Sequence, residues 1–194
     1  KRFSFNDVYQ LGSIIEVNDL VQHHIEEIFK LNLVDIQLIR KNKYKVIVDC
    51  INSTGTISVA PLLKALGCEV ILLNEEMNGD FAHNPEPLAQ HLVELCEKVK
   101  SEKADLGIAI DHDVDRLSFI CEDGSLLGEE NTLVAIAKYV LSQTPGTTVS
   151  NLSSTRGLRD VTEAFGEKYY AAAVGEVNVV EKMKSVGAII GGEG

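Results

Sequence analysis

Two hydrophobic patterns alternate along most of the chain. Short runs rich in Val, Ile and Leu predict buried strands, and stretches with apolar residues spaced three or four apart predict amphipathic helices. The predicted strands are 45–50, 69–73, 105–110 and 117–121, and the predicted helices are 17–31, 55–66, 88–100 and 130–141. Strands and helices that alternate in this way predict an α/β fold, with a mixed, largely parallel sheet flanked by helices and an antiparallel strand at its edge.

A second, shorter unit repeats this plan. In each unit a strand leads to a Ser-Thr pair, at 53–54 and at 154–155, and then to a helix that Gly67 or Gly166 ends. We expect these pairs to cap the helices and not to act as nucleophiles. We interpret the repeat as a duplicated unit whose second copy stops early, so we expect the chain to be a fragment. The predicted organisation is an irregular lead-in over 1–17, an α/β domain over 18–145 and an incomplete second α/β domain over 146–194.

Composition narrows the range of functions. The chain has 194 residues, is 45% hydrophobic and carries a formal net charge of −11. Its apolar runs fall short of the roughly 18 to 20 residues of a membrane span, and it opens without the apolar segment of a secretory signal. The negative charge argues against nucleic acid and membrane as partners. The cysteines at 50, 68, 96 and 121 lie far apart, which indicates a reducing, cytoplasmic location.

The most informative segment is Asp111-His112-Asp113-Val114-Asp115-Arg116, which directly follows the apolar run 106–110. In an extended backbone Asp111, Asp113 and Asp115 would share one face, roughly 6 to 7 Å apart, and the side chain of His112 would point away. Three such carboxylates repel one another unless a cation lies between them. Oxygen ligands favour Mg²⁺ or Ca²⁺, and an incomplete protein cage leaves room for phosphate oxygens. The segment therefore predicts an Mg²⁺ loop for phosphoryl chemistry.

Other interpretations of the acidic segment stay open. It can be a solvated turn, a non-catalytic Ca²⁺-binding module, or the strand-end motif of a haloacid-dehalogenase-like phosphatase with Asp111 as nucleophile and Asp113 as acid/base. An EF-hand would place Glu122 at loop position 12. That interpretation is rejected, because Arg116 stands where the loop needs Gly and the flanks are β-like.

The chain resembles the α-D-phosphohexomutase family, which contains phosphoglucomutases, phosphomannomutases and phosphoglucosamine mutases. The acidic segment is similar to the family's metal loop, Asp-Gly-Asp-Gly-Asp-Arg. Further similarity lies in 79–87, in 174–179 and in the terminal Gly191-Gly192-Glu193-Gly194. The resemblance implies that residues up to about 142 match the second of four domains and that 147 onward match the first part of the third. The first and fourth domains would be missing partners of the same protein.

The resemblance also implies a reaction. The intact protein would be an Mg²⁺-dependent isomerase that moves phosphate between C1 and C6 of a hexose phosphate, through a phosphoserine of the first domain and a bisphosphorylated sugar. Because that serine is absent here, the fragment alone would be inactive. The implied ligands of Mg²⁺ are Asp111, Asp113 and Asp115, Arg116 would contact phosphate, and Glu193 with Gly192 and Gly194 would bind the sugar. One departure is Ala171-Ala172-Ala173, where many members carry Arg or Lys.

Overall fold

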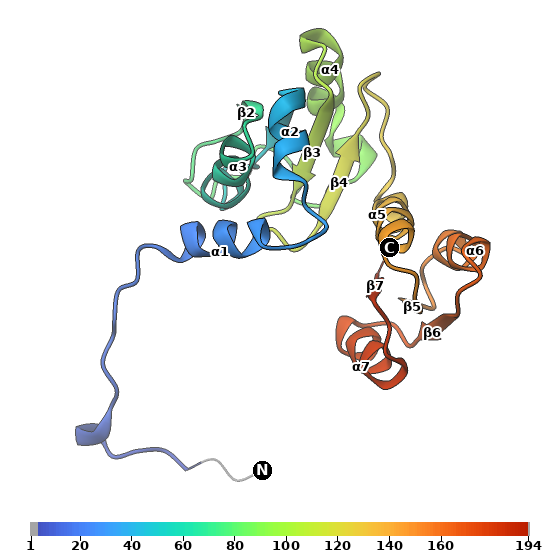
Figure 1. Cartoon of the computed structure of the whole chain (residues 1–194). Coiled ribbons are helices and arrows are strands. Elements are labelled where there is room, and N and C mark those ends of the chain that lie inside the picture. Colours follow the sequence, from blue (N-terminus) through green and yellow to red (C-terminus); the bar gives the residue numbers. More distant parts are fainter. Residues whose placement is uncertain (1–3, 194) are drawn as a thin grey trace.

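The computed structural model describes residues 4–193 (Figure 1). The first α/β unit follows the predicted order of elements, with an additional α-helix, α2, and a short 3₁₀ helix, η1, in the lead-in. Its elements are η1 (Val8–Gln10), α1 (Leu20–Phe29), α2 (Ile36–Asn42), β1 (Lys45–Asp49), α3 (Gly55–Ala65), β2 (Glu69–Leu73), η2 (Ala89–His91), α4 (Val93–Glu102), β3 (Leu106–Ile110) and β4 (Leu117–Ile120). Helix α2 is too short to give a clear periodic pattern, and Asp35 caps it by accepting a hydrogen bond from the amide of Leu38 at 2.9 Å.

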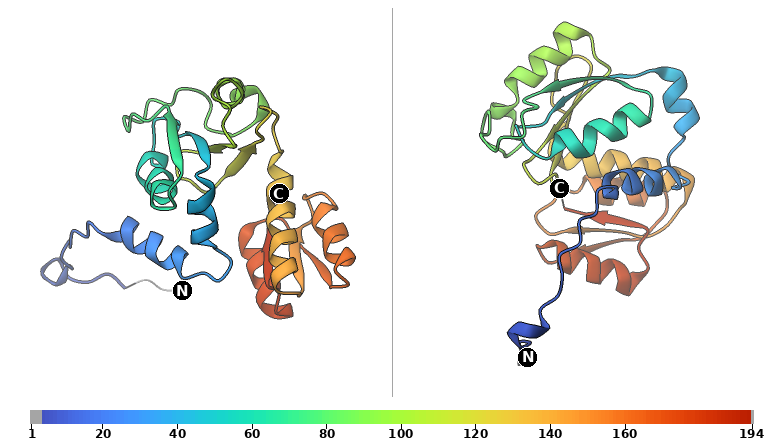
Figure 2. Two further views of the ribbon diagram at one scale, coloured as in Figure 1. Left: turned by 45° about the horizontal axis from the view of Figure 1, so that its top comes forward. Right: turned by 90° about the vertical axis from the view of Figure 1, so that its left-hand side faces the viewer.

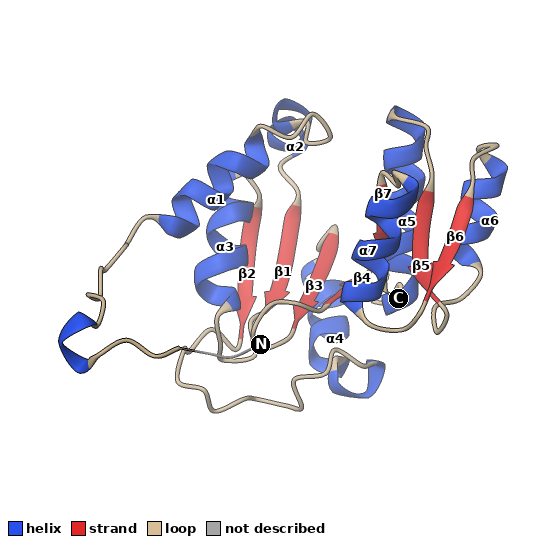
Figure 3. Ribbon diagram, turned by 90° about the horizontal axis from the view of Figure 1, so that it is seen from below, coloured by secondary structure: helices blue, strands red, loops and turns tan. Residues whose placement is uncertain are grey.

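The first sheet has the strand order β2-β1-β3-β4. Strand β1 runs parallel to β2 and β3, whereas β4 is antiparallel to β3. Figure 3 shows the three parallel strands side by side. Val59 and Leu63 of α3 pack against one face of this sheet, and Leu95 and Val99 of α4 pack against the other. The sequence prediction of a largely parallel sheet between helices, with an antiparallel edge, is confirmed.

The second unit contains α5 (Glu129–Gln143), β5 (Thr148–Asn151), α6 (Gly157–Ala164), β6 (Tyr169–Ala172), α7 (Glu176–Val186) and β7 (Ile190–Gly192). Its three strands are all parallel and have the order β6-β5-β7, which matches the order β2-β1-β3 of the first sheet. The matching order supports the predicted duplication. Helix α5 contacts β4 of the first sheet and β7 of the second, so it lies between the two units (Figure 2).

The two glycines before Glu193, Gly191 and Gly192, lie inside β7. A Cβ atom on Gly191 would lie 2.6 Å from the carbonyl oxygen of Val149, on the neighbouring strand β5. Close packing between β7 and β5 therefore requires glycine at 191.

Residues 4–19, which precede α1, extend away from both units (Figures 1 and 2). Their side chains include Phe5, Tyr9 and Ile14, which are all more than nine-tenths exposed. Within the described residues, no helix combines the length and the hydrophobicity needed to cross a membrane.

Candidate functional site

The carboxyl ends of β1, β2 and β3 meet at one edge of the first sheet, which is where ligands bind to sheets of this kind. Strand β3 ends at Ile110, and Asp111 follows it with only 4% of its surface exposed. Oδ1 of Asp111 accepts hydrogen bonds from the amides of Asp115 at 3.0 Å and Arg116 at 3.1 Å. The carboxylate of Asp111 thus shapes the acidic loop and also presents oxygen at the sheet edge.

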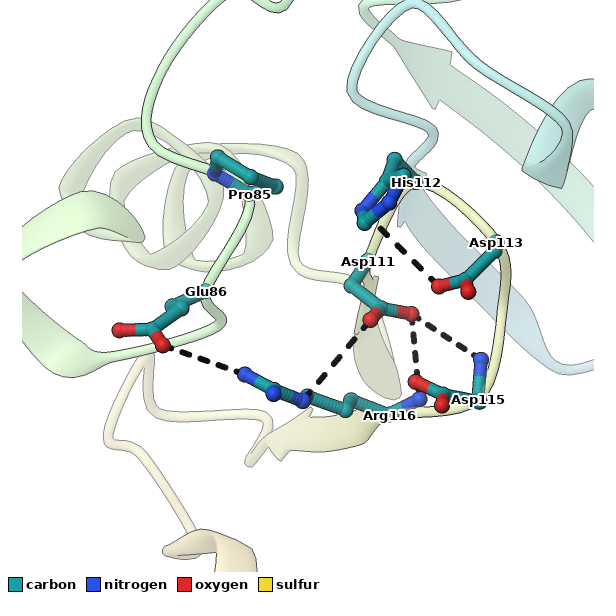
Figure 4. A pocket seen from close by; sticks show the side chains of 7 residues that line it. All are labelled: Pro85, Glu86, Asp111, His112, Asp113, Asp115 and Arg116. Carbon is teal, nitrogen blue, oxygen red and sulfur yellow. Dashed lines mark hydrogen bonds and ion pairs between the residues drawn. The ribbon is translucent and has the colours of Figure 1, made fainter.

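The backbone after Asp111 does not stay extended, so that part of the sequence prediction is wrong. The amide of Val114 donates to the carbonyl oxygen of Asp111 at 3.3 Å, and Val114 has a φ of 63°, a left-handed conformation that is costly for a β-branched residue. The segment is a tight turn, and alternation does not apply to it. His112 therefore lies on the same side as the aspartates, although we expected it to point away (Figure 4).

The turn forms one wall of an open pocket of about 270 Å³ (Figure 4). The described residues that line it are Pro85, Glu86, Asp111, His112, Asp113, Asp115 and Arg116. All three aspartates of the predicted metal loop are therefore brought together. One ligand atom each from Asp111, His112 and Asp113 lies within 4.8 Å of the others.

The carboxylates crowd one another. A hydrogen bond with the side chain of Asp111, followed by the negative charges of Asp111 and Asp113, raises the pKa of Asp115. Burial tends to raise the pKa of Asp111, but hydrogen bonds from the Arg116 amide, from the Asp115 side chain and amide and from the Asp113 side chain outweigh burial and lower it. A divalent cation would relieve this repulsion, and the carboxylate donors fit a hard ion such as Mg²⁺.

Arg116 adds positive charge to the rim of the pocket. Its Nη1 lies 3.3 Å from Oε1 of Glu86, and its Nε lies 3.9 Å from Oδ2 of Asp111. The Arg116 side chain is 56% exposed, so guanidinium donors are still available to an anion in the pocket. Arg116, which the sequence predicts to contact phosphate, therefore lies beside the predicted metal ligands.

Two hydroxyl groups of the first Ser-Thr pair tie the acidic turn to the start of α3. Ser53 Oγ and Thr54 Oγ1 donate to the carbonyl oxygen of His112 at 2.7 and 2.8 Å. The prediction that they cap α3 is wrong, because the Thr54 side chain makes no capping bond and both hydroxyls reach across to the turn. Of the second pair, Thr155 does accept from the amide of Gly157, at 3.3 Å.

A second cluster of hydrogen-bonded polar residues lies at the carboxyl ends of β5 and β7. Oε1 of Glu193 accepts hydrogen bonds from Nδ2 of Asn151 at 2.8 Å and from the amide of Gly175 at 2.6 Å. Sequence reasoning missed Asn151, although a polar residue at the end of a buried strand was a usable signal. Glu193 is not among the described residues that line the pocket, and Gly194 lies outside the described residues.

Family comparisons agree with the two-unit architecture. Residues 22–124 match the family model described as phosphoglucomutase/phosphomannomutase, alpha/beta/alpha domain II. Residues 129–194 match alpha/beta/alpha domain III of the same family. The second match begins at residue 129 and so includes α5, whereas the division after residue 145 stays a prediction from the sequence.

Several relatives align along nearly the whole chain. A phosphoglucomutase/phosphomannomutase of Thermococcus kodakarensis is 33% identical, over 99% of this chain and 41% of the relative. A probable phosphoglucosamine mutase of Methanopyrus kandleri is 30% identical, over 95% of this chain and 40% of the relative. The chain thus spans about two fifths of the length of the curated relatives that it matches.

Solved structures show the same fold. A phosphoglucomutase/phosphomannomutase family protein of Burkholderia thailandensis superposes with a TM-score of 0.76 and 27% identity, over 90% of this chain and 37% of that chain. A putative phosphomannomutase of Thermus thermophilus gives a TM-score of 0.83 at 23% identity, over 94% of this chain and 43% of that chain. At that identity the second likeness concerns the fold alone.

Proposed function

The chain belongs to the phosphoglucomutase/phosphomannomutase family, and from that premise we propose that it supplies the metal loop and a sugar-binding glutamate to a phosphohexomutase. The full-length protein would interconvert hexose 1-phosphate and hexose 6-phosphate. The observation that carries the proposal is the pocket in which three aspartates and Arg116 converge at the carboxyl edge of a parallel sheet.

Asp111, Asp113 and Asp115 would hold Mg²⁺. When bound, the ion would neutralise negative charge on the phosphoryl group that is transferred. Asp111 also keeps the turn closed through its two backbone hydrogen bonds, so the ligands would be preorganised. Ser53 and Thr54 would support this arrangement by fixing the carbonyl group between Asp111 and Asp113.

Arg116 would bind phosphate through the planar fork of its guanidinium group. Its partner Glu86 holds one end of the group, and Asp111 lies near Nε. The phosphate would therefore meet an oriented cation next to the metal ligands. By family resemblance, the phosphate donor is a serine of another domain, and the sugar passes through a bisphosphorylated form.

Glu193 would accept hydrogen bonds from sugar hydroxyl groups. Oε1 is already occupied by Asn151 and Gly175, whereas no described protein group donates to Oε2. Oε2 is the oxygen that we assign to the sugar. Gly192 is the last residue of β7 and precedes Glu193, and Gly194 follows Glu193 in the sequence. Both glycines belong to the proposed sugar-binding segment.

A phosphatase that uses Asp111 as nucleophile fits the geometry less well. Asp111 is buried, its Oδ1 accepts two backbone amides, and its Oδ2 faces Arg116. These contacts orient the carboxylate toward a structural and metal-binding role. A non-catalytic Ca²⁺-binding module, which would use the same ligands, remains the non-enzymatic alternative.

For the whole protein we propose a cytoplasmic location, because the four cysteines of this chain are all free.

Two measurements on the full-length protein test the proposal. Mass spectrometry after incubation with substrate should locate phosphate on a serine outside this chain, whereas phosphate trapped on Asp111 would contradict the proposal and support the phosphatase. A substrate panel should follow 1-to-6 phosphate exchange with mannose, glucose and glucosamine phosphates in the presence of Mg²⁺. Exchange with at least one of them is expected, and tight Ca²⁺ binding without any exchange would favour the binding module.

A further inference from the structure

A buried carboxylate at the end of β1 has no part in the site described so far. Asp49 is 2% exposed. Its Oδ1 accepts hydrogen bonds from the amide of Ile51 at 3.1 Å and from Nδ2 of Asn74 at 2.9 Å, and its Oδ2 lies 2.9 Å from Nε2 of His83. A buried charge of this kind is costly unless every oxygen has a partner. His83 supplies the partner that the backbone and Asn74 leave open.

The ring of His83 faces oxygen on both sides. Nδ1 lies 2.8 Å from the carbonyl oxygen of Asn84, which can only accept, so Nδ1 must carry a proton. Nε2 lies 2.9 Å from Oδ2 of the Asp49 carboxylate, whose Oδ1 accepts two further N–H groups. Both contacts are satisfied together when the ring is an imidazolium.

His91 provides a contrast on the neighbouring helix η2. Its ring stacks on His83 with centroids 6.5 Å apart. Nδ1 of His91 faces the carbonyl oxygen of Glu86 at 3.0 Å, but its Nε2 faces an amide nitrogen of Gln90 at 3.1 Å. One ring nitrogen of His91 thus faces an acceptor and the other faces a donor. The two histidines therefore differ in the hydrogen-bond partners that surround their rings.

The segment anchored by His83 contacts the acidic turn on both sides of the anchor. We define the flank loop as residues 79–87. Before the anchor, Phe81 packs against the ring of His112 with centroids 5.5 Å apart. After it, Pro85 and Glu86 line the pocket, and Glu86 pairs with Arg116. Asn52 holds the start of the flank loop through Gly79 and Asp80, and Ser118 holds its end through the carbonyl oxygen of Pro87. The exposed Glu86–Arg116 contact is weak, so the buried His83–Asp49 contact is the anchor for the middle of the loop.

We propose that Asp49 and His83 form a positioning pair, in which a protonated His83 fixes the flank loop so that Glu86 orients Arg116 toward phosphate. Only the last step rests on the proposed function. The charged groups that face the ring are Asp49 of β1 and Glu94 of α4, and the titratable ring beside it is His91 of η2. Deprotonation of His83 would leave Nε2 facing an acceptor and would loosen the loop.

The pKa of His83 agrees with this geometry. Burial tends to lower it, but the hydrogen bonds with Asp49 and Asn84 and the charges of Asp49 and Glu94 outweigh burial, so the pKa is raised above 6.5. The protonated ring is therefore kept at pH values around 6.5, and the pair is lost as the pH rises through the raised pKa.

Histidine NMR spectra of this chain test the pair directly. In ¹⁵N spectra recorded from about pH 5 to about pH 9, the ring of His83 should lose its second proton only above the ordinary histidine value of 6.5. Asp49→Asn should lower the midpoint of the His83 titration, and His91→Gln serves as the matched control. The proposal would be overturned if His83 titrated below pH 6.5 in the wild type and its titration curve were unchanged in Asp49→Asn.

Two further readouts test positioning. His83→Gln should accelerate hydrogen exchange at the amides of Glu86 and Leu88 about tenfold near neutral pH. It should also abolish the loss of protection that the wild type shows at alkaline pH beyond the intrinsic base catalysis of exchange, whereas unchanged exchange would overturn the positioning role. In the full-length protein, kcat/KM should fall about tenfold in His83→Gln, and its decline at alkaline pH should disappear. If full-length wild type transfers no phosphate, the proposed function fails, and the spectra and amide exchange of this chain still decide the pair.

Discussion

Asn151 and Glu193 are joined by a hydrogen bond of 2.8 Å from Nδ2 to Oε1, which links the ends of two adjacent strands across 42 residues of sequence. Asn151 is 3% exposed, and its Oδ1 accepts from the amide and the hydroxyl group of Ser154. The side-chain amide of Asn151 is therefore fixed in one orientation. It presents Nδ2 as a donor to Glu193, the residue that we assign to sugar binding.

This geometry predicts the effect of Asn151→Asp. The change turns a donor into a negatively charged acceptor opposite Glu193, so we expect the free energy of unfolding to fall by about 1–3 kcal/mol. Urea unfolding of the chain measures the loss. Asn178→Asp is the matched control, because Asn178 lies on the exposed surface of α7 and its side chain donates to the carbonyl oxygen of Val174, away from Glu193. Equal stability of Asn151→Asp and wild type would contradict the assigned bond.

Packing beneath the acidic turn predicts a second effect. A Cβ atom on Gly107 of β3 would lie 2.7 Å from both Ile120 Cβ and Val99 Cγ2. We expect Gly107→Ala to lower the free energy of unfolding by about 1–3 kcal/mol, because both neighbours belong to the core. Gly12→Ala is the control, since a Cβ there has nothing within 4 Å. Thermal unfolding should separate the two variants, and a Gly107→Ala chain as stable as Gly12→Ala would refute this packing.

The two hydroxyl groups on the carbonyl of His112 predict a third effect. Ser53→Ala together with Thr54→Val removes both donors, each worth about 0.5–1.5 kcal/mol. We expect lower stability and about tenfold weaker Mg²⁺ binding by calorimetry, because the turn that carries the ligands loses its support. Ser58→Ala removes a hydroxyl that bonds the carbonyl oxygen of Thr54 and not the acidic turn, so it should leave Mg²⁺ binding unchanged. If the double variant binds Mg²⁺ as wild type does, the hydroxyl pair has no role in the site.

The raised pKa of His83 predicts how stability depends on pH. The folded state binds the proton more tightly than the unfolded state, so the contribution is fully present below the ordinary value of 6.5 and is lost as the pH rises through the folded pKa. Urea unfolding at several pH values should show this decline in wild type. His83→Gln should lack it. A wild-type contribution that grows as the pH rises through that range would have the wrong sign for this ion pair.

The sequence predicted the features that depend on local pattern. Apolar runs located β1 and β3, and the strand end before Asp111 identified the acidic turn. The conformation of the turn was predicted incorrectly, because hydrogen bonds to Asp111 close it, and alternation holds only for extended backbone. The short helix α2 was missed because its few apolar positions give no clear period.

The contacts that support the site are nonlocal, and no single-sequence pattern reports them. Ser53 reaches His112 across 59 residues, and His83 reaches Asp49 across 34. These pairs form because parallel strands bring their carboxyl ends to one edge, where side chains from distant segments meet. The sequence does show polar residues at the ends of buried strands, such as Asp49 and Asn151. It does not show which distant residues form hydrogen bonds with them.

The most direct test of the central claim is the rate of 1-to-6 phosphate exchange by the full-length protein carrying Asp113→Asn. The change keeps the shape of a side chain in the proposed metal site and removes its charge. We expect the rate to fall about a hundredfold, which corresponds to about 2.7 kcal/mol, while Asp123→Asn, in an exposed turn outside the pocket, stays within about twofold of wild type. Turnover by Asp113→Asn equal to that of Asp123→Asn would contradict the assignment of the acidic turn as the metal site of a phosphohexomutase.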